Sequence, residues 1–426
     1  RSSATAEDLP EASFAGQLET FLNIEGENAV LDATRRCYAS LFTDRAISYR
    51  ENHGFDHMKV ALSVGVQKMI RSDLASSGVM FSIDTETGFP RSVLITGAWG
   101  LGETVVQGIV DPDEYQVFKP LLDADGARPI VEKVRGAKSE KMIFAPLGSR
   151  SPTRTVKTSA EERGRFTLDD DEVLQLARWA VAIEEHYGLP MDMEWAKDGE
   201  TGELFIVQAR PETVQSRRDA GQLKTFTLAD TGELLVTGLS VGDAVGIGKV
   251  CKLKSPTEIE KFEPGAVLVT GMTDPDWVPI MKKAAAIVTD HGGRTSHAAI
   301  VSRELGLPAV VGAGDASAVL EDGRKVTVSC FEADAGYVYA GRANVTVEEI
   351  DVDRIPKTRA KAMVNLANPS AAFRWWRLPT DGVGLARMEF IISNHIKVHP
   401  MALVRYDAVE DTAVRDEIDE IGRAHV

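Results

Sequence analysis

The sequence predicts a protein of several domains that combine α/β and α+β structure. Its 426 residues exceed what one ordinary hydrophobic core organises, and the usual domain size predicts about two to four domains. Hydrophobic residues make up 43% and charged residues 26% of the chain. Both values are near globular averages, which argues against long disorder and fibrous repeats. Helical periodicity alternates with short β-rich runs, as in mixed folds.

Charge and cysteine usage exclude several classes of partner. The net charge of −16 would repel nucleic acid and anionic membranes over most approaches, so any phosphate site must be a local basic pocket. We find no apolar run of about 18 residues and no signal segment. Cys37, Cys251 and Cys330 are scattered without metal-ligand spacing, so we expect reduced thiols in a cytoplasmic protein.

The first predicted domain covers residues 1–215. Its clearest helix is 169–187, because acidic residues fill the first turn, apolar residues recur at helical spacing, and glycine and proline follow. The run MDMEWAKDGETGELFIVQAR, residues 191–210, holds two strand-like segments around a polar loop with glycine, which predicts a hairpin. The polar segment 216–235 is predicted to be a linker.

A compact β-rich domain is expected over residues 236–342. Its short, glycine-punctuated strands are interrupted by a helix at 296–305, with Thr295 or Ser296 as N-cap and a glycine just past the end. A second linker is predicted at 343–360. The runs AKAMVNL and DGVGLARMEFII in residues 361–426 then resemble the opening units of a (β/α)8 barrel.

The two ends of the chain suggest a fragment. The chain opens on Arg1 inside a motif, and it stops soon after the barrel-like pattern begins. We therefore expect truncation at both ends. The tail EIDEIGRAHV continues no pattern, and we keep it out of the fold prediction.

The stretch TDHGGRTSHAAIVSRELGLPAVVG, residues 289–312, carries the most informative chemistry. His297 falls in the first turn of the predicted helix, where free N–H donors and positive potential disfavour the imidazolium and attract a phosphoryl group. A neutral imidazole at this point is a competent nucleophile. From the residues alone, two readings stay open, a histidine that merely begins a helix and one that accepts a phosphoryl group.

This stretch resembles the phosphohistidine signature shared by phosphoenolpyruvate synthases, pyruvate phosphate dikinases and related PEP-utilising enzymes. The resemblance implies that His297 is the phosphoryl carrier, that Arg294 and Thr295 contact phosphate, and that the domain around them is a swivelling β/β/α unit. Many phosphoenolpyruvate synthases have cysteine where this chain has Ser296, which affects the subfamily and leaves the carrier role untouched.

By composition, the first residues are either a polar surface loop or a phosphate site. RSSATAEDLPEASFAGQ sets small and hydroxyl-bearing residues beside Arg1, and such a loop can cradle phosphate oxygens. The string resembles the ATP-grasp domain of phosphoenolpyruvate synthases, which favours water over inorganic phosphate as second acceptor. Arg45 or Arg50 resembles another ATP-contacting arginine, and the choice between them stays open. The glycines of WGLGETVVQG, residues 99–108, are assigned to turns.

The hairpin supplies polar groups for a second wall. Strand alternation puts Asp192 and Glu194 on one face, and Ile206, Gln208 and Arg210 on one face of the partner strand. If these faces coincide, carboxylate and amide oxygens suit Mg²⁺ and the arginine suits phosphates. The family resemblance implies that Glu194 and Gln208 hold Mg²⁺ while Arg1 and Arg210 grip ATP.

The run GVGLARMEF resembles the start of the family's phosphoenolpyruvate-binding barrel, which implies that Arg387 binds the phosphate of the substrate. The resemblance predicts conversion of ATP, pyruvate and water to phosphoenolpyruvate, AMP and phosphate, with self-association through the barrel as a further expectation. Pyruvate phosphate dikinase and a rifampicin-type phosphotransferase are the alternatives. GVGLARMEF argues against the rifampicin type. A non-catalytic phosphocarrier is disfavoured because a pure carrier needs no ATP site.

Overall fold

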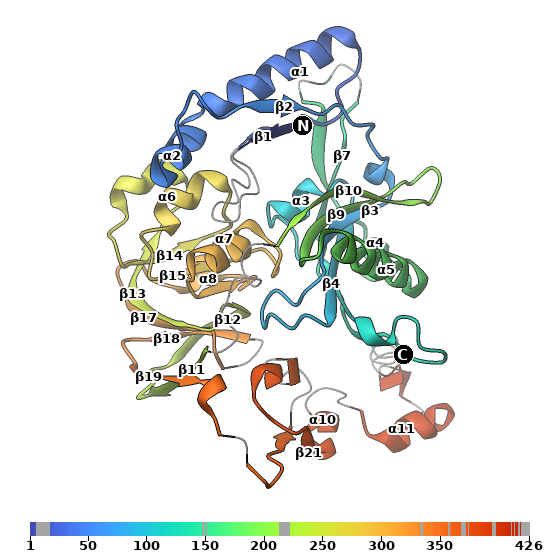
Figure 1. The fold of residues 1–426 in the computed structure, drawn as a ribbon, viewed down its shortest axis with the longest axis vertical. Helices are drawn as coiled ribbons and strands as arrows, with labels where there is room; N and C mark the ends of the chain where they lie inside the picture. The colour runs from blue at the N-terminus through green and yellow to red at the C-terminus, as the bar shows by residue number, and fades with distance from the viewer. Residues whose placement is uncertain are drawn as a thin grey trace.

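The computed structural model describes residues 1–5, 18–146, 149, 151–212, 222–332, 335–356, 358–367, 372–373, 375–393, 398–409, 411–412, 414–415 and 418. Figure 1 shows an amino-terminal lobe at the top, a sheet domain at the right, a central domain at the left and a carboxyl-terminal segment below them. In these described ranges, no helix has the length and apolar character needed to cross a membrane.

The amino-terminal lobe (residues 1–5 and 18–70) is a small layer of two strands and two helices. The strands pair antiparallel, and Ala4 and Ala46 are buried where the strands and helices meet. The lobe's elements are β1 (Ser2–Ala4), α1 (Glu27–Ala39), α2 (Asp44–His53) and β2 (Leu62–Val64).

The sheet domain (residues 71–212) is built on a six-stranded antiparallel sheet in the order β10-β9-β3-β4-β5-β6. A second pair, β7 and β8, forms its own antiparallel ribbon. The elements are β3 (Ser76–Phe81), β4 (Ser92–Trp99), α3 (Glu103–Val106), β5 (Asp113–Phe118), β6 (Ile130–Val134), β7 (Glu140–Phe144), β8 (Thr153–Lys157), α4 (Ala160–Arg163), α5 (Asp170–Tyr187), β9 (Met191–Lys197) and β10 (Leu204–Pro211).

Helix α5 confirms the predicted helix and covers one face of this sheet. The side chain of Asp169 accepts a hydrogen bond from Glu172 N at 2.9 Å, the side chain of Glu172 accepts one from Asp169 N at 3.1 Å, and Gly188 ends the helix in the left-handed conformation. Leu176 of α5 is fully buried against the sheet in the same core as Trp195 of β9. Burying one such leucine stabilises the fold by ~1.5–3 kcal/mol.

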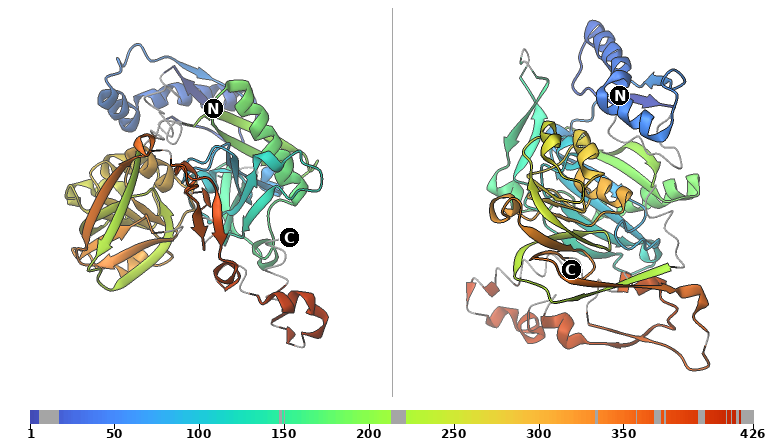
Figure 2. Two further views of the ribbon diagram at one scale, coloured as in Figure 1. Left: turned by 60° about the horizontal axis from the view of Figure 1, so that its bottom comes forward. Right: turned by 90° about the vertical axis from the view of Figure 1, so that its left-hand side faces the viewer.

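The central domain (residues 234–340) is a closed barrel of seven strands, of which β12 was not predicted. The predicted β/β/α domain is therefore a β-barrel whose short helices pack on the outside of the barrel. Its elements are β12 (Leu234–Val241), β13 (Val245–Lys252), β14 (Val267–Thr270), α6 (Val278–Met281), β15 (Ala286–Thr289), α7 (His297–Leu305), β16 (Ala309–Val311), α8 (Ala316–Val319), β17 (Lys325–Ser329) and β18 (Ala335–Ala340). Figure 2 (left) shows this domain beside the sheet domain.

Strand direction in the central domain decides where its polar loops meet. β14 and β15 run parallel in the register Thr270↔Thr289, so the loops that follow both strands leave the same edge of the barrel. The second loop leads into α7, where Ser296 is the N-cap and Gly306 ends the helix in the left-handed conformation. Ser296, of the two predicted candidates, is therefore the cap.

Parts of the two segments predicted as linkers form strands in the described residues. β11 (Gln222–Ala229) pairs along its whole length with β19 (Asn344–Asp351) in an antiparallel ribbon. The predicted boundary at residue 236 also shifts, because β12 already begins at Leu234. The polar composition of both segments reflects a two-stranded ribbon with exposed faces, which sequence alone does not distinguish from a linker.

The carboxyl-terminal segment contains a parallel pair of strands. These are β20 (Val364–Leu366) and β21 (Val383–Ala386), followed by α10 (Met388–Ile391) and α11 (Pro400–Val404). Trp376 joins the segment to the sheet domain, since its Nε1 donates to Thr87 O at 3.2 Å. Parallel pairing agrees with the predicted opening of a barrel, and the (β/α)8 barrel itself stays a prediction.

Candidate active site

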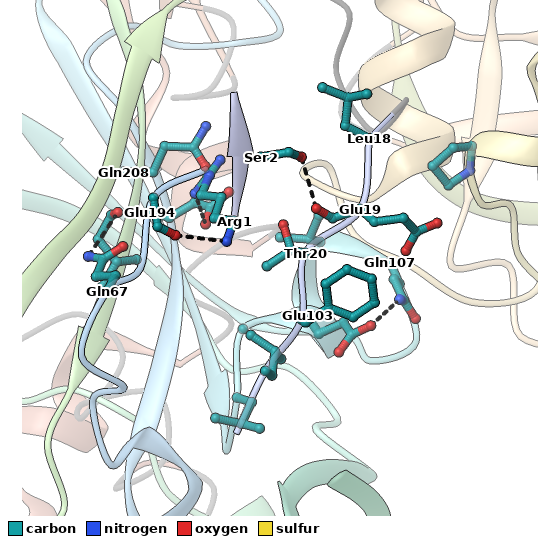
Figure 3. Close-up of a pocket in the computed structure, with 18 of the residues that line it drawn as sticks. Arg1, Ser2, Leu18, Glu19, Thr20, Gln67, Glu103, Gln107, Glu194 and Gln208 are labelled. Carbon is teal, nitrogen blue, oxygen red and sulfur yellow. Dashed lines mark hydrogen bonds and ion pairs between the residues drawn. The ribbon is translucent and has the colours of Figure 1, made fainter. Parts of the chain in front are cut away.

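A cavity of about 1040 Å³ lies where the amino-terminal lobe, the sheet domain and the central domain meet. Its walls include five residues that the sequence singled out, which are Arg1, Glu194, Gln208, Arg210 and His297. Figure 3 shows Arg1, Glu194 and Gln208 grouped at one side of the cavity. Residues from three structural units therefore line the same cavity.

The hairpin wall has the arrangement that strand alternation predicted for its polar groups. In the antiparallel pair β9–β10, Gln208 lies directly opposite Glu194 and Arg210 opposite Asp192. Directly opposed residues have neighbouring side chains on one face of a sheet. The carboxylate, amide and guanidinium groups are therefore brought together by the strand register.

Ile206 does not share a face with Gln208 and Arg210 as predicted, because a β-bulge lies between Ile206 and Gln208. The register shifts between Ile206 and Gln208, so Ile206 pairs with Trp195 and packs against the core of the sheet domain. The extra residue, Val207, joins Gln208 in lining the cavity. Simple alternation failed here because a bulge inserts one residue into one strand and reverses the faces beyond it.

Charged groups on this wall are already paired. Arg1 Nη1 lies 3.8 Å from Glu194 Oε2, and Arg210 donates to Asp192 Oδ2 from Nε at 2.8 Å and from Nη2 at 2.7 Å. Burial raises the pKa of Glu194, and the nearby Arg1 and Arg210 guanidinium groups offset part of that rise. The wall thus presents two guanidinium groups held by carboxylates, and guanidinium groups are suited to binding phosphate oxygens.

Gln208 and Glu194 fit a magnesium ion by the chemistry of their oxygens. The buried Gln208 Oε1 has no hydrogen-bond partner among the described residues, and it belongs to the side chain opposite the Glu194 carboxylate. Such an orphaned acceptor costs free energy unless something binds it. The described ranges contain no group of three or more His, Cys, Asp or Glu residues able to hold a metal. This agrees with the usual Mg²⁺ site, where one or two protein oxygens act together with substrate phosphates.

His297 enters the cavity from the first turn of α7. Its Nδ1 lies 2.9 Å from the Thr273 hydroxyl, which belongs to the loop after β14. Burial lowers the pKa of His297 to about 4, so the imidazole is neutral at physiological pH. If the hydroxyl accepts the Nδ1 proton, the lone pair on Nε2 is left available as a nucleophile.

The loop before His297 is seated against the sheet domain. Gly108 has a φ of +71°, and a Cβ there would lie 2.6 Å from Ser296 Cβ, so only glycine permits this approach. Thr295 is buried with its Oγ1 3.4 Å from Thr96 Oγ1, and Arg294 Nη1 lies 3.8 Å from Glu114 Oε2. Neither residue is among the described lining of the cavity, so their predicted phosphate contacts remain untested.

The remaining predicted cations are not among the described residues that line the cavity. Arg50 is buried and donates to Leu41 O at 2.6 Å and to His57 Nδ1 at 2.9 Å, which is a structural role within the amino-terminal lobe. Arg45 lies on α2, and its side chain is outside the described residues. Arg387 is the exposed N-cap residue of α10, with its guanidinium 5.9 Å from the Phe390 ring centre.

Sequence reasoning missed several residues of the cavity. Glu103 and Gln107 line it from the WGLGETVVQG segment, where Gly102 and Gly108 form turns as predicted and Gly100 forms an isolated bridge with Met142. Lys282 lines it from the end of α6. Thr273 was also missed. A usable signal existed for Thr273, because polar residues that follow neighbouring parallel strands converge at one edge.

Comparison with protein families gives two matches. Residues 1–228 match the family described as pyruvate phosphate dikinase, AMP/ATP-binding domain. Residues 262–333 match the PEP-utilising enzyme, mobile domain. The first match covers the amino-terminal lobe and the sheet domain, and the second covers the part of the central domain that contains His297.

The chain is also similar to proteins named phosphoenolpyruvate synthase. It is 56% identical to the protein of Synechocystis sp. over 100% of this chain and 52% of the relative. Identity is 54% to the protein of Aquifex aeolicus and 55% to that of Escherichia coli, over 99% of this chain and 51% and 53% of those relatives. The chain therefore spans about half the length of these relatives.

Proposed function

Since the chain belongs to the pyruvate phosphate dikinase AMP/ATP-binding domain family, we propose that it carries the phosphoryl-transfer part of a phosphoenolpyruvate synthase. In the proposed overall reaction, ATP, pyruvate and water give AMP, phosphoenolpyruvate and phosphate. The observation that carries the proposal is a neutral His297 in the same cavity as Glu194, Gln208, Arg1 and Arg210. Names of relatives more than 50% identical support the choice of reaction.

ATP binds with its phosphates towards the hairpin wall. Arg1 and Arg210 balance the charge of the phosphate oxygens, and Glu194 and Gln208 would hold Mg²⁺ through carboxylate and amide oxygens. When bound, Mg²⁺ would neutralise further charge on the polyphosphate. The Asp192 carboxylate orients Arg210 through two hydrogen bonds, so the guanidinium is positioned before the nucleotide arrives.

His297 is the acceptor of the first step. The Thr273 hydroxyl accepts a hydrogen bond from Nδ1–H, and Nε2 attacks the β-phosphorus of ATP in line. The bond from that phosphorus to the oxygen shared with the α-phosphate breaks, so AMP leaves with this oxygen. Water then releases the terminal phosphoryl group as phosphate, which leaves one phosphoryl group on His297. The central domain then carries the phosphohistidine to a pyruvate site in the predicted barrel. There Arg387 binds the phosphate of phosphoenolpyruvate. The enzyme works in the cytoplasm on small-molecule substrates.

Mass spectrometry of the intact protein tests the proposal. Incubation with ATP and Mg²⁺ should add one phosphoryl group that is labile in acid and stable in base, as a phosphoramidate is. His297→Ala should abolish the adduct. His291→Ala, which changes an exposed histidine six residues earlier, is the matched control and should retain it. An adduct that persists undiminished in His297→Ala would rule out the assignment.

A further inference from the structure

The central domain contacts the sheet domain along α7 and the loop that precedes it. On the loop side, Gly292 N donates to Asp111 Oδ1 at 3.2 Å, and Gly293 packs on Pro112. The loop also carries one long charge contact, with Arg294 Nη1 3.8 Å from Glu114 Oε2. A closer contact between two charged side chains lies at the other end of α7.

That second contact centres on Glu86. Its Oε1 accepts hydrogen bonds from Arg303 Nε at 3.1 Å and from Arg303 Nη2, and its Oε2 accepts one from Gly242 N at 3.2 Å. The Arg303 side chain is only 3% exposed. Glu86 therefore holds the central domain at α7 and at the turn after β12 with one carboxylate.

The turn that carries Glu86 is ordered by its own hydrogen bonds. Asp84 Oδ1 accepts from Glu86 N at 2.8 Å and from Thr87 N at 2.9 Å, while Gln116 Nε2 donates to Asp84 Oδ2 at 3.0 Å. Burial raises the pKa of Glu86, but Arg303, Arg294 and the Gly242 N–H outweigh burial, so its pKa lies below the usual value. The carboxylate is thus charged and preset for its partner.

Arg303 and His297 belong to the same rigid element. α7 runs from His297 to Leu305, with His297 in its first turn and Arg303 in its last. Fixing Arg303 therefore fixes the direction in which the first turn points. Loop contacts hold one end of α7, and Glu86 holds the other.

We propose that Glu86 is a positioning residue that docks the central domain so that His297 enters the ATP cavity. This inference rests on the proposed function, since it concerns the ATP half-reaction. A buried ion pair suits a domain that must also leave, because the water regained by both charges on separation offsets much of their attraction. The opposite charges of Glu86 and Arg303 still favour one docked orientation of the central domain over others.

Glu86→Gln tests this role because it keeps the size of the side chain and leaves Arg303 without its counter-charge. We expect the rate of ATP-dependent phosphorylation of His297 to fall about tenfold or more, as for a typical coupling between sites. Glu86 does not line the ATP cavity among the described residues, but its partner Arg303 does, so nucleotide affinity is measured by titration of the same variant and phosphorylation rates are compared at saturating ATP. Solution X-ray scattering should show a larger radius of gyration.

The matched control is Glu184→Gln, which removes a partly buried ion pair with Lys119 inside the sheet domain. It should lose comparable thermal stability while keeping the wild-type phosphorylation rate and radius of gyration. The charge exchange Glu86→Arg with Arg303→Glu should phosphorylate faster than either single variant.

The two proposals fail in different ways. An unchanged rate and an unchanged radius of gyration in Glu86→Gln would overturn the positioning role. Failure of the wild-type protein to form the adduct would overturn the proposed function, and scattering would still decide whether Glu86 docks the domain.

Discussion

The chemistry of the site depends on an uncharged imidazole at residue 297. Two features of the fold keep it neutral, which are burial in the cavity and a position in the first turn of α7, where the helix dipole opposes positive charge. The Thr273 hydroxyl adds a fixed partner for Nδ1. The proposed attack of His297 on phosphorus would therefore need no prior loss of a proton from its ring.

We predict that His297 titrates near its lowered pKa of about 4, well below the ordinary 6.5. Between these two values the unfolded chain binds more protons at this residue than the folded chain does, so this group makes the protein less stable as the pH falls through that window. NMR of ¹⁵N-histidine-labelled protein, with His297→Ala for assignment, measures the titration directly. A midpoint near 6.5 would contradict the buried, neutral state.

Single residues were predictable where a local pattern defined their environment. A strand, a glycine turn and an N-cap located His297, and alternation in two strands located Glu194, Gln208 and Arg210. Thr273 is 24 residues from His297, and its role depends on which barrel strands are neighbours. The role of Arg50 could not be predicted, because a buried structural arginine and an ATP-contacting arginine look alike in sequence.

At the scale of elements, the β9–β10 pair explains how an amide comes to lie buried without a partner. The bulge at Val207 turns Ile206 into the core and leaves Gln208 facing Glu194 across the strands. Hairpin, helix and barrel strands were predictable from period and turn residues. The bulge and the β11–β19 ribbon were not, because neither leaves a distinct local signature in these residues.

We predict that Gln208→Met separates stability from nucleotide binding. Methionine has a similar shape and removes the orphaned Oε1, so the free energy of unfolding without ligand should rise by about 1 kcal/mol. Affinity for ATP in Mg²⁺ should fall, since one magnesium ligand is lost. Chemical denaturation and calorimetric titration measure the two effects.

Gln175→Met is the control for this substitution. It makes the same change on the exposed surface of α5 and should leave nucleotide affinity unchanged. If Gln208→Met lowers the stability of the ligand-free protein and retains full affinity, the amide oxygen is not reserved for the metal and nucleotide.

At the scale of the whole molecule, the active cavity exists only because three units meet. His297 belongs to one unit and the hairpin wall to another, and the contacts that join these units link residues far apart in sequence, such as Gly292 with Asp111. Composition and periodicity identify structural units within the sequence. They carry no information on how two folded units pack against each other. The sequence therefore predicted the parts of the site and left their assembly to family resemblance.

Independence of the central domain follows from its architecture. The barrel is closed, so it has no unpaired sheet edge, and two buried clusters fill its interior and the space beneath its helices. Ala343 N bonds to Thr327 Oγ1 at 3.0 Å, which extends the unit slightly past β18. The sheet domain contributes contacts on one side of α7 and none of the barrel strands.

We therefore predict that residues 232–343 fold alone, with a cooperative thermal transition by circular dichroism. The pKa of His297 should move up towards 6.5 in this piece, because removing the other walls of the cavity returns water to the imidazole. ATP and Mg²⁺ should not phosphorylate it, since Glu194, Gln208 and Arg210 are absent. The same piece with His297→Ala assigns the NMR signal and sets the background for mass spectrometry. Phosphorylation of the isolated domain by ATP, above that background, would mean that the central domain binds nucleotide by itself and that the hairpin wall is not the phosphate site.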